Sequence, residues 1–134
     1  MSKTGGEALV ESIKAKGVEV VFGIPGVQLY HLMDAFYKNP EIKFIVTRHE
    51  QGAAYMADGY ARASGKEGVC VVVPGPGLLN ASAAIGTAYS ASSPVLVLTG
   101  QINKDYISLE TGELHEIHEQ LDVMKPITKS AERV

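Results

Sequence analysis

The sequence predicts an α/β domain with three layers, in which helices cover both faces of a central, mostly parallel β-sheet. Two observations lead to this class. Short apolar runs alternate with longer segments that carry apolar residues at helical spacing, which is typical of strands joined by helical crossovers. One of the runs, residues 69–73, is apolar at every position, as expected for a strand that is buried on both faces of a parallel sheet.

Each element has its own local signals. Thr4 or Ser2 can cap a first helix that ends at Gly17, and Asn39-Pro40 ends the second helix because the residue before a proline avoids helical backbone angles. The predicted strands are residues 18–22, 42–46, 69–73 and 95–98. The second helix follows the turn that ends at Gly26, and the third and fourth helices span residues 50–64 and 78–90. Residues 100–117 have the pattern of a loop, after which a short helix at 119–124 precedes a last extended stretch near 127–129.

Length and composition fit one globular domain that spans residues 1–134. The chain has 134 residues, of which 46% are hydrophobic and 20% charged, and a chain of this size can bury roughly two-thirds of its unfolded surface. The net charge of −3 gives no electrostatic reason to expect nucleic acid or an anionic membrane as a partner. No run resembles a signal core or a membrane span, and the one cysteine, Cys70, lies in a predicted core strand, so we expect a cytoplasmic protein.

The helix expected at residues 78–90 contains no charged residue. A surface helix normally has a charged stripe, and one side of this helix has to cover the sheet. We therefore expect its other side to meet a partner, and we expect the same of a small-residue face on the preceding helix. The alternative is a modestly polar surface helix that exposes Asn80, Ser82 and Ser90. The small-residue face consists of Ala53, Ala54, Ala57 and Ala61.

Glu50 is the strongest candidate for chemistry in this sequence. It follows an apolar run at residues 44–46 and lies in the first turn of the next helix, a junction that faces the ligand crevice in a parallel α/β sheet. The structural alternative is a carboxylate that only stabilises the helix macrodipole, by ~0.3–1 kcal/mol. Glycine-containing turns at residues 23–26, 74–77 and 100 should lie at the same edge of the sheet, where glycine allows the backbone to approach a ligand closely.

The sequence lacks the motifs of several other kinds of ligand site. It contains neither a phosphate-binding loop nor a Gly-x-Gly-x-x-Gly fingerprint. No cluster of His, Cys and Asp residues has the spacing of metal ligands. We therefore expect no metal site in this chain.

Three motifs occur together in the order and spacing of a known family. They are Val-Phe-Gly-Ile-Pro-Gly at residues 21–26, Arg-His-Glu-Gln-Gly-Ala-Ala-Tyr-Met-Ala-Asp-Gly-Tyr-Ala-Arg at residues 48–62, and Pro-Gly-Pro-Gly-x-x-Asn at residues 74–80. Through them the chain resembles, over essentially its whole length, the N-terminal pyrimidine-binding domain of thiamine diphosphate-dependent enzymes. The resemblance is to the branch that contains acetolactate synthase, pyruvate oxidase and related 2-oxoacid decarboxylases and carboligases.

This resemblance implies roles for particular residues. Glu50 corresponds to the family's catalytic glutamate, which binds the N1′ nitrogen of the cofactor's aminopyrimidine ring. Acetolactate synthases usually have Phe-Gln-Glu where this chain has residues 115–117, His-Glu-Ile, which indicates a less specialised relative rather than a true acetolactate synthase. Besides Glu50, the implied cofactor-binding residues are Pro25, Gly26, Pro74, Gly77 and Asn80, and the implied substrate-side residues are Val27, His115 and Glu116.

The resemblance also implies that the chain forms only half of an active site. The family binds the diphosphate group and Mg²⁺ through a Gly-Asp-Gly…Asn motif in another domain, and this sequence has no such motif. We therefore expect it to bind only the pyrimidine end of thiamine diphosphate and to be inactive alone. Its expected partners are a diphosphate-binding domain that holds the Mg²⁺, a 2-oxoacid substrate, and further copies of the chain in a homodimer or higher oligomer formed through the apolar helices.

Two other interpretations remain open at this point. The chain could be a non-catalytic assembly module that keeps the fold and uses its apolar helices for association, although Glu50 in its complete motif argues against this. It could also be a flavodoxin-like nucleotide binder that uses the turn at residues 74–77, for which no phosphate fingerprint is present. The sequence does not identify the 2-oxoacid or its acceptor.

Overall fold

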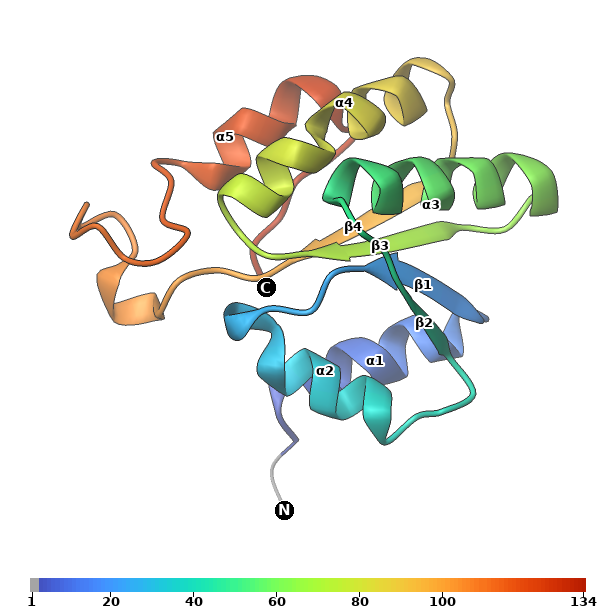
Figure 1. The fold of residues 1–134 in the computed structure, drawn as a ribbon, viewed down its shortest axis with the longest axis horizontal. Coiled ribbons are helices and arrows are strands. Elements are labelled where there is room, and N and C mark those ends of the chain that lie inside the picture. The colour runs from blue at the N-terminus through green and yellow to red at the C-terminus, as the bar shows by residue number, and fades with distance from the viewer. Residues whose placement is uncertain (1–2) are drawn as a thin grey trace.

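The computed structural model describes residues 3–134 and has the alternation of strands and helices that the sequence predicts (Figure 1). Four parallel strands form one sheet in the order β2-β1-β3-β4. The strands are β1 (Val20–Gly23), β2 (Lys43–Val46), β3 (Gly68–Val72) and β4 (Val95–Thr99), and the helices are α1 (Gly5–Ala15), α2 (Tyr30–Tyr37), α3 (Glu50–Ser64), α4 (Pro76–Ser90) and α5 (Gln120–Met124). Short 3₁₀ helices occur at Val27–Leu29, Lys104–Tyr106 and Lys125–Ile127.

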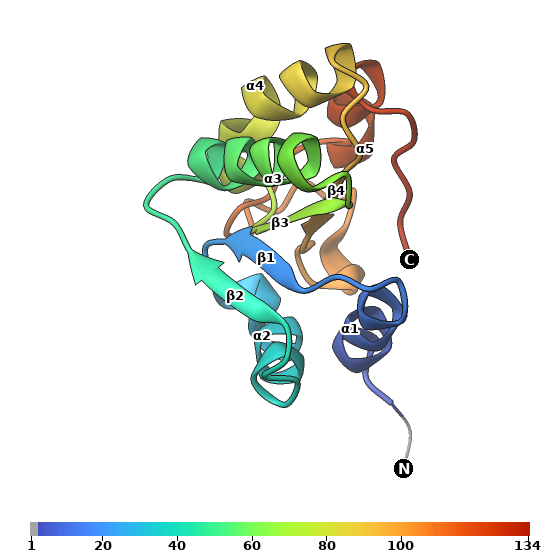
Figure 2. The ribbon, with the colours of Figure 1, turned by 90° about the vertical axis from the view of Figure 1, so that its right-hand side faces the viewer.

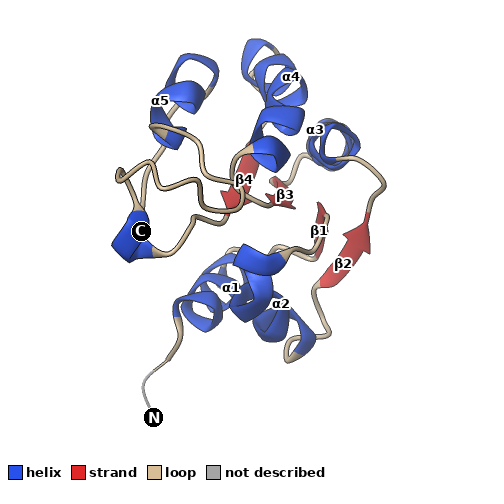
Figure 3. Ribbon diagram, turned by 60° about the vertical axis from the view of Figure 1, so that its left-hand side comes forward, coloured by secondary structure: helices blue, strands red, loops and turns tan. Residues whose placement is uncertain are grey.

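The helices lie in two layers on opposite faces of the sheet, so the predicted three-layer class is confirmed. One face is covered by α1 and α2, and the other by α3 and α4 with α5 beside them (Figure 2 and Figure 3). Every residue of β3 is buried, as predicted for the central apolar run. Each face of the sheet has its own apolar core, one containing Val69 and Val71 and the other containing Cys70 and Val72, because alternate residues of a strand point to opposite faces.

The first helix begins as its sequence signals predict. The Thr4 side chain accepts the backbone N–H of Glu7, and the Glu7 carboxylate accepts the N–H of Thr4, which together form a capping box. Ser2, the other predicted cap, lies outside the described residues. The strand after this helix begins at Val20 and not at Val18, because the N–H of Val18 binds the carbonyl of Ile13 and so still belongs to the helix end.

Two other differences from the sequence prediction are larger than the one-residue shifts at the ends of β2, β3, β4 and α5. Helix α4 begins at Pro76, two residues earlier than expected, because proline is well tolerated in the first turn, where its missing N–H would have no helical partner. The extended stretch predicted near residues 127–129 is wrong in its first residue, since Ile127 closes a 3₁₀ helix. Thr128 has extended backbone angles, but its hydroxyl donates to the Met124 carbonyl, and the residues form no strand of the sheet.

The small-residue face of α3 is used inside the domain, which corrects the expectation that it meets a partner. Its four alanines are at most 2% exposed, and Ala53, Ala54 and Ala57 belong to the same core cluster as Ala81 and Ala84 of α4. A side chain at Gly68 would clash with the backbone of Ala57, so α3 also lies directly against the start of β3. The alanine pairing brings the N-terminal ends of α3 and α4 together.

The outer sides of the sheet and of α4 remain exposed. Strands β2 and β4 are the two edges of the sheet, and Leu96 on β4 is 41% exposed. On α4, Leu79 and Tyr89 are 43% and 52% exposed, which agrees with the predicted outward apolar side of that helix. Across residues 3–134, none of the helices combines the length and apolar character needed to cross a membrane.

Candidate functional site

Glu50 is the first residue of α3, and a local hydrogen bond fixes the start of that helix. His49 is the N-cap, and its Nδ1 accepts the backbone N–H of Gln51 at 3.1 Å. The Thr47 hydroxyl donates to the carbonyl of His49 at 3.1 Å. These bonds hold the turn between β2 and α3, so that the half-buried Glu50 side chain leaves from the positively polarised end of the helix.

The first turn of α4 brings a second polar group to Glu50. Asn80 Nδ2 donates to Glu50 Oε2 at 3.0 Å. Gly77 lies on the other side of the carboxylate, since a Cβ at this position would lie 3.6 Å from Glu50 Oε1. The structure therefore brings together three predicted site residues that are separated by up to 30 positions in the sequence, and Glu50 Oε1 stays available for a ligand.

Two of the predicted glycines are required by close contact with Val73. A Cβ at Gly77 would lie 2.6 Å from Val73 Cγ2, and a Cβ at Gly26 would overlap Val73 Cγ1. Pro74, which follows Val73, is fully buried, whereas Pro25 is exposed. The β1 and β3 turns therefore meet around Val73 at the carboxyl edge of the sheet, as the parallel arrangement requires.

The substrate-side candidates lie on two segments joined by hydrogen bonds. Val27 is 52% exposed, and the next residue, Gln28, contacts both the Leu114 carbonyl and the His115 ring. The structure thus places His115 beside the β1 turn, from which it is 87 residues distant in sequence.

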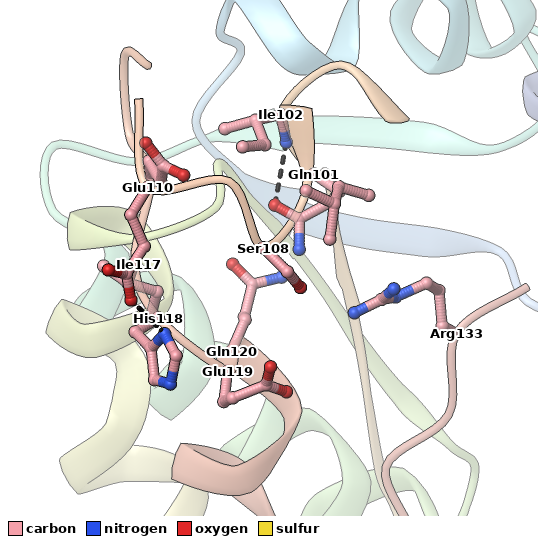
Figure 4. Close-up of a pocket in the computed structure, with 11 residues that line it drawn as sticks. Gln101, Ile102, Ser108, Glu110, Ile117, His118, Glu119, Gln120 and Arg133 are labelled. Atoms are coloured by element: carbon pink, nitrogen blue, oxygen red, sulfur yellow. Dashed lines mark hydrogen bonds and ion pairs between the residues drawn. The ribbon is translucent and has the colours of Figure 1, made fainter. Parts of the chain in front are cut away.

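Glu116 is held within its own loop. Its Oε2 accepts the backbone N–H groups of Gly112 and Glu113 at 2.7 and 2.9 Å. The other side of this segment borders a small polar cavity, which Glu110 and His118 line with 2.6 Å between Oε1 and Nδ1 (Figure 4). The Glu116 carboxylate therefore acts first as a backbone acceptor that shapes the loop beside His115.

Gln120 is a site residue that sequence reasoning missed. Its side chain is only 5% exposed, with Oε1 accepting the N–H of Gly75 and Nε2 donating to the carbonyl of Gly100, both at 3.1 Å. Gly75 has φ +58° and ψ −117°, a conformation that favours glycine. Gln120 therefore joins the ends of β3 and β4, but a glutamine in a short polar segment carries no signal of this in the sequence.

Two buried groups lie away from the Glu50 carboxylate. Burial is the largest single influence on the pKa of Asp58 and raises it. The hydrogen bond from Arg62 Nε at 2.9 Å, the nearby Ser93 hydroxyl and the Arg62 charge together outweigh burial, so the pKa falls below its usual range. Burial raises the pKa of the Cys70 thiol to about 12. Cys70 is fully buried in β3, which confirms its prediction as a core residue. Over residues 3–134 no group of three or more His, Cys, Asp or Glu residues is arranged to hold a metal ion.

Comparisons with known proteins match this chain to one family. Residues 3–125 match the family model described as "Thiamine pyrophosphate enzyme, N-terminal TPP binding domain". The match includes Glu50, the turns around Val73, and the segment of Gln120.

Several curated relatives are similar to the chain along nearly all of its length. A probable 2-ketoarginine decarboxylase of Pseudomonas aeruginosa is 46% identical over 127 residues, which cover 93% of this chain and 22% of that protein. A probable acetolactate synthase large subunit of Methanocaldococcus jannaschii is 46% identical over 125 residues, covering 93% of this chain and 20% of the relative. An acetolactate synthase of Arthrospira platensis is 43% identical over 129 residues, with 94% and 22% coverage. The chain thus spans about a fifth of the length of the relatives it matches.

Proposed function

Because the chain belongs to the family of thiamine pyrophosphate enzyme N-terminal domains, we propose that it forms the pyrimidine side of an active site that acts on 2-oxoacids. The reaction proposed is decarboxylation or carboligation of a 2-oxoacid such as pyruvate. The relatives that support this class are named as acetolactate synthases and as a 2-ketoarginine decarboxylase. In this proposal the chain is inactive alone, and the complete enzyme consists of this chain together with a diphosphate-binding domain.

The observation that carries the proposal is the position of Glu50 between the ends of α3 and α4. One carboxylate oxygen is held by Asn80 at 3.0 Å, and the other lies beside Gly77, where a Cβ would be 3.6 Å from it. A carboxylate at this place can share a proton with a ring nitrogen, and Asn80 keeps the carboxylate from rotating away. The macrodipole role of Glu50 does not explain the Asn80 contact or the requirement for glycine at position 77.

The residues at this edge fit an aminopyrimidine ring. The ring offers nitrogen acceptors and an amino donor, and the site offers a carboxylate, a carboxamide and backbone groups of the two glycine turns. A side chain at Gly26 or Gly77 would overlap Val73, so both turns have to be glycine to pack on Val73 at this edge. We propose that Gly26, Pro74 and Gly77 line the ring, that Pro25 continues this surface, and that Glu50 and Asn80 bind its polar edge.

The chain's own contribution to the chemistry is the control of one proton. When bound, thiamine diphosphate supplies the carbon nucleophile that attacks the 2-oxoacid carbonyl and the electron sink for loss of CO₂. Glu50 holds the proton that it shares with the pyrimidine nitrogen. Asn80 orients Glu50, and the glycine turns exclude water from one face of the ring.

A second domain is required for the diphosphate end. Residues 3–134 contain no cluster that could hold Mg²⁺, and the turns at residues 23–26 and 74–77 carry no cationic side chain. We propose that the diphosphate-binding domain docks on the exposed outer sides of α3 and α4, where Met56, Leu79 and Tyr89 are 43–52% exposed. Self-association into a homodimer or larger oligomer through this surface is part of the same proposal.

Calorimetry with thiamine diphosphate and Mg²⁺ tests the proposal. Weak or no binding is expected for the chain alone, and binding should appear when the diphosphate-binding domain is added. Glu50→Gln in the complete enzyme should lower turnover of pyruvate by at least about a hundredfold, because proton transfer by a positioned group contributes roughly 10²–10⁴. Glu67→Gln, in the exposed turn between α3 and β3, is the matched control and should leave turnover unchanged.

The same experiments separate the alternatives. Near-normal turnover of the Glu50→Gln enzyme would rule out the catalytic role. Binding of the second domain without any binding of thiamine diphosphate would favour a non-catalytic assembly module. Tight binding of a nucleotide by the chain alone would instead favour a flavodoxin-like binder.

A further inference from the structure

The side chain of Gln120 makes two hydrogen bonds whose directions cannot be exchanged. Its Oε1 accepts the backbone N–H of Gly75, and its Nε2 donates to the carbonyl of Gly100, each at 3.1 Å. An N–H only donates and a carbonyl only accepts, so a carboxamide rotated by half a turn would face both partners with the wrong group. Gln120 is 5% exposed, and its bond to Gly75 is buried. The ends of β3 and β4 therefore fix the orientation of this amide.

Gly75 depends on a contact from outside α4, because it cannot cap the helix with a side chain of its own. It is the N-cap residue of α4, a position usually taken by a residue whose side chain binds a free N–H. Its carbonyl accepts the N–H of Leu79 at 2.9 Å, the first bond of the helix. Glycine is also the residue whose backbone is least restricted by its own atoms. The bond to Gln120 therefore holds the peptide from which α4 begins.

The first turns of α4 carry the groups that lie against Glu50. A Cβ at Gly77 would be 3.6 Å from Glu50 Oε1, and Asn80 Nδ2 donates to Glu50 Oε2 at 3.0 Å. Asn80 follows Gly75 by a little more than one helical turn, about 7.5 Å along the axis. A change of direction at Gly75 therefore displaces the Asn80 side chain, and a misplacement of about 1 Å at a reacting group costs roughly a hundredfold in rate.

Attachment of α5 to the domain does not by itself explain the two bonds of Gln120. Met124 of α5 is 5% exposed and belongs to the same core cluster as Ile85 of α4, so apolar contact already holds this short helix. Glu119 has φ +45°, a left-handed conformation that is uncommon for a residue other than glycine. The chain adopts this conformation immediately before Gln120, whose side chain reaches the start of α4 from there.

We propose that Gln120 is a positioning residue for Glu50, and that it acts through Gly75 and the first turns of α4. By holding the Gly75 peptide, Gln120 sets where Asn80 lies against the Glu50 carboxylate, and the bond to Gly100 keeps the carboxamide turned toward Gly75. Gln120 itself contacts neither cofactor nor substrate. Its effect on catalysis rests on the proposed function, whereas its effect on Asn80 concerns this chain alone.

The first test follows the Gly75 amide and the Asn80 side-chain amide by NMR in the 134-residue chain. Gln120→Met is similar in length but has no group for either bond. In this variant the Gly75 amide should exchange faster with solvent, and the Asn80 side-chain signals should move toward those of a free carboxamide. Gln120→Glu keeps an oxygen for the Gly75 N–H, so both groups should stay close to the wild type.

Met124→Ala is the matched control, because it weakens the same helix without removing a bond of Gln120. It creates a cavity and should lower the melting temperature at least as much as Gln120→Met, but the signals of Gly75 and Asn80 should not move. Unchanged Asn80 signals in Gln120→Met overturn the proposal, as do equal shifts in Gln120→Met and Met124→Ala. Equal shifts in Gln120→Met and Gln120→Glu overturn the assignment to Gly75.

The second test uses the same variants in the complete enzyme. Gln120→Met should lower kcat between about tenfold and a hundredfold, with KM for pyruvate within about twofold, because Glu50 and Asn80 are proposed to bind the cofactor and not the substrate. Met124→Ala should keep kcat near that of the wild type at a temperature where both variants are folded.

A double-mutant cycle shows whether Gln120 acts through Asn80. When Asn80 is already replaced by alanine, Gln120→Met should lower kcat by no more than about twofold, since both residues act on the same contact with Glu50. Losses that multiply fully would mean that Gln120 acts by another route, and they overturn the proposal.

The outcomes distinguish this inference from the proposed function. A wild-type enzyme that is active, with equal kcat values for Gln120→Met and Met124→Ala, overturns the role of Gln120 in catalysis but leaves Glu50 as the catalytic group. A wild-type enzyme without thiamine diphosphate-dependent turnover overturns the proposed function. In that case the NMR result still decides whether Gln120 positions Asn80 against Glu50.

Discussion

Gly77 shows how little space a single residue leaves at the carboxylate. The nearest atoms to a Cβ at this position would be Val73 Cγ2 at 2.6 Å and Glu50 Oε1 at 3.6 Å. Glycine therefore allows α4 to pack on Val73 directly beside the Glu50 carboxylate. The sequence indicated a turn at this place, but the contact with Val73 could not be inferred from residue spacing.

We expect Gly77→Ala to weaken cofactor binding and to destabilise the domain. An additional methyl group in a packed interior costs about 1–3 kcal/mol, and here it also approaches the carboxylate. Thermal unfolding and calorimetry with thiamine diphosphate in the complete enzyme would measure the two effects. Gly86→Ala is the control, because its Cβ would contact only Ile127 at 3.8 Å and should stabilise the helix by roughly 0.5–1 kcal/mol. Equal binding by both variants would contradict the ring position proposed for Gly77.

Because the thiol of Cys70 is buried, we expect the free energy of unfolding to fall in alkaline solution. Its pKa is raised by burial from an ordinary value of 9.0 to about 12 in the folded chain. The unfolded chain therefore releases this proton first as the pH rises, and the free energy of unfolding should fall between pH 9 and 12. The fall is at most about 1.4 kcal/mol per pH unit.

Denaturant unfolding of the wild type and of Cys70→Ala at several pH values would check this. The variant starts from a lower stability because it creates a cavity, but its stability should decline less steeply above pH 9. Tyrosine and lysine titrations contribute equally to both proteins and cancel in the comparison. Parallel curves would show that Cys70 does not titrate on unfolding.

At the scale of elements, the start of α3 depends on one imidazole. His49 Nδ1 accepts the N–H of Gln51 at 3.1 Å, in the position that Ser, Thr, Asn or Asp usually occupies at a helix N-terminus. Histidine is not a common cap, so the sequence predicted the helix from its apolar pattern and not from this bond. The cap matters for the site because the next residue is Glu50.

Replacing His49 by alanine should destabilise the domain by about 0.5–2 kcal/mol, the usual loss for a helix cap. His49→Asn should recover most of this loss, since a side-chain oxygen can accept the same N–H. Thermal unfolding measures the stability, and turnover of the complete enzyme reports whether Glu50 is still held in place. If asparagine and alanine gave the same melting temperature, capping would not be the role of His49.

The elements themselves were largely predictable, whereas their contacts were not. Strict alternation of apolar strands and helical patterns gave every helix and strand of the sheet, because each is long enough to show its own period. Two contacts had no local signal: Gln120 binds glycine backbone from a polar segment 45 residues away from Gly75, and Gln28 binds a loop 86 residues away. The sequence predicted that the alanines of α3 meet a partner. Their contact with the alanines of α4 has no local signal, because the two sets lie on different helices.

For the molecule as a whole, the outer side of α4 is the surface on which the proposed partner depends. Leu79→Glu should weaken association with the diphosphate-binding domain by at least about tenfold, because a charge buried in an interface without a partner is costly. The free chain should unfold within about 0.5 kcal/mol of the wild type, as is usual for exposed positions. Analytical ultracentrifugation measures the first quantity and denaturant unfolding the second.

Tyr37→Glu provides the control for this surface. Tyr37 is 86% exposed at the end of α2, on the opposite face of the sheet, and its substitution should leave association unchanged. An equal loss of association in both variants would indicate a general effect of charge. No loss in Leu79→Glu would move the partner to another face of the molecule.

The free edge of β4 has a consequence for how this chain behaves in concentrated solution. Within residues 3–134 the strand pairs with β3 alone, it contains no charged residue or proline, and Leu96 is 41% exposed on it. Natural sheets usually protect such an edge with charges, prolines or a covering segment, since an unprotected edge recruits extended strands from other molecules. β4 is thus the segment at which aggregation of the isolated chain should begin, and a lysine at position 96 is the first change to make when a more soluble sample is needed.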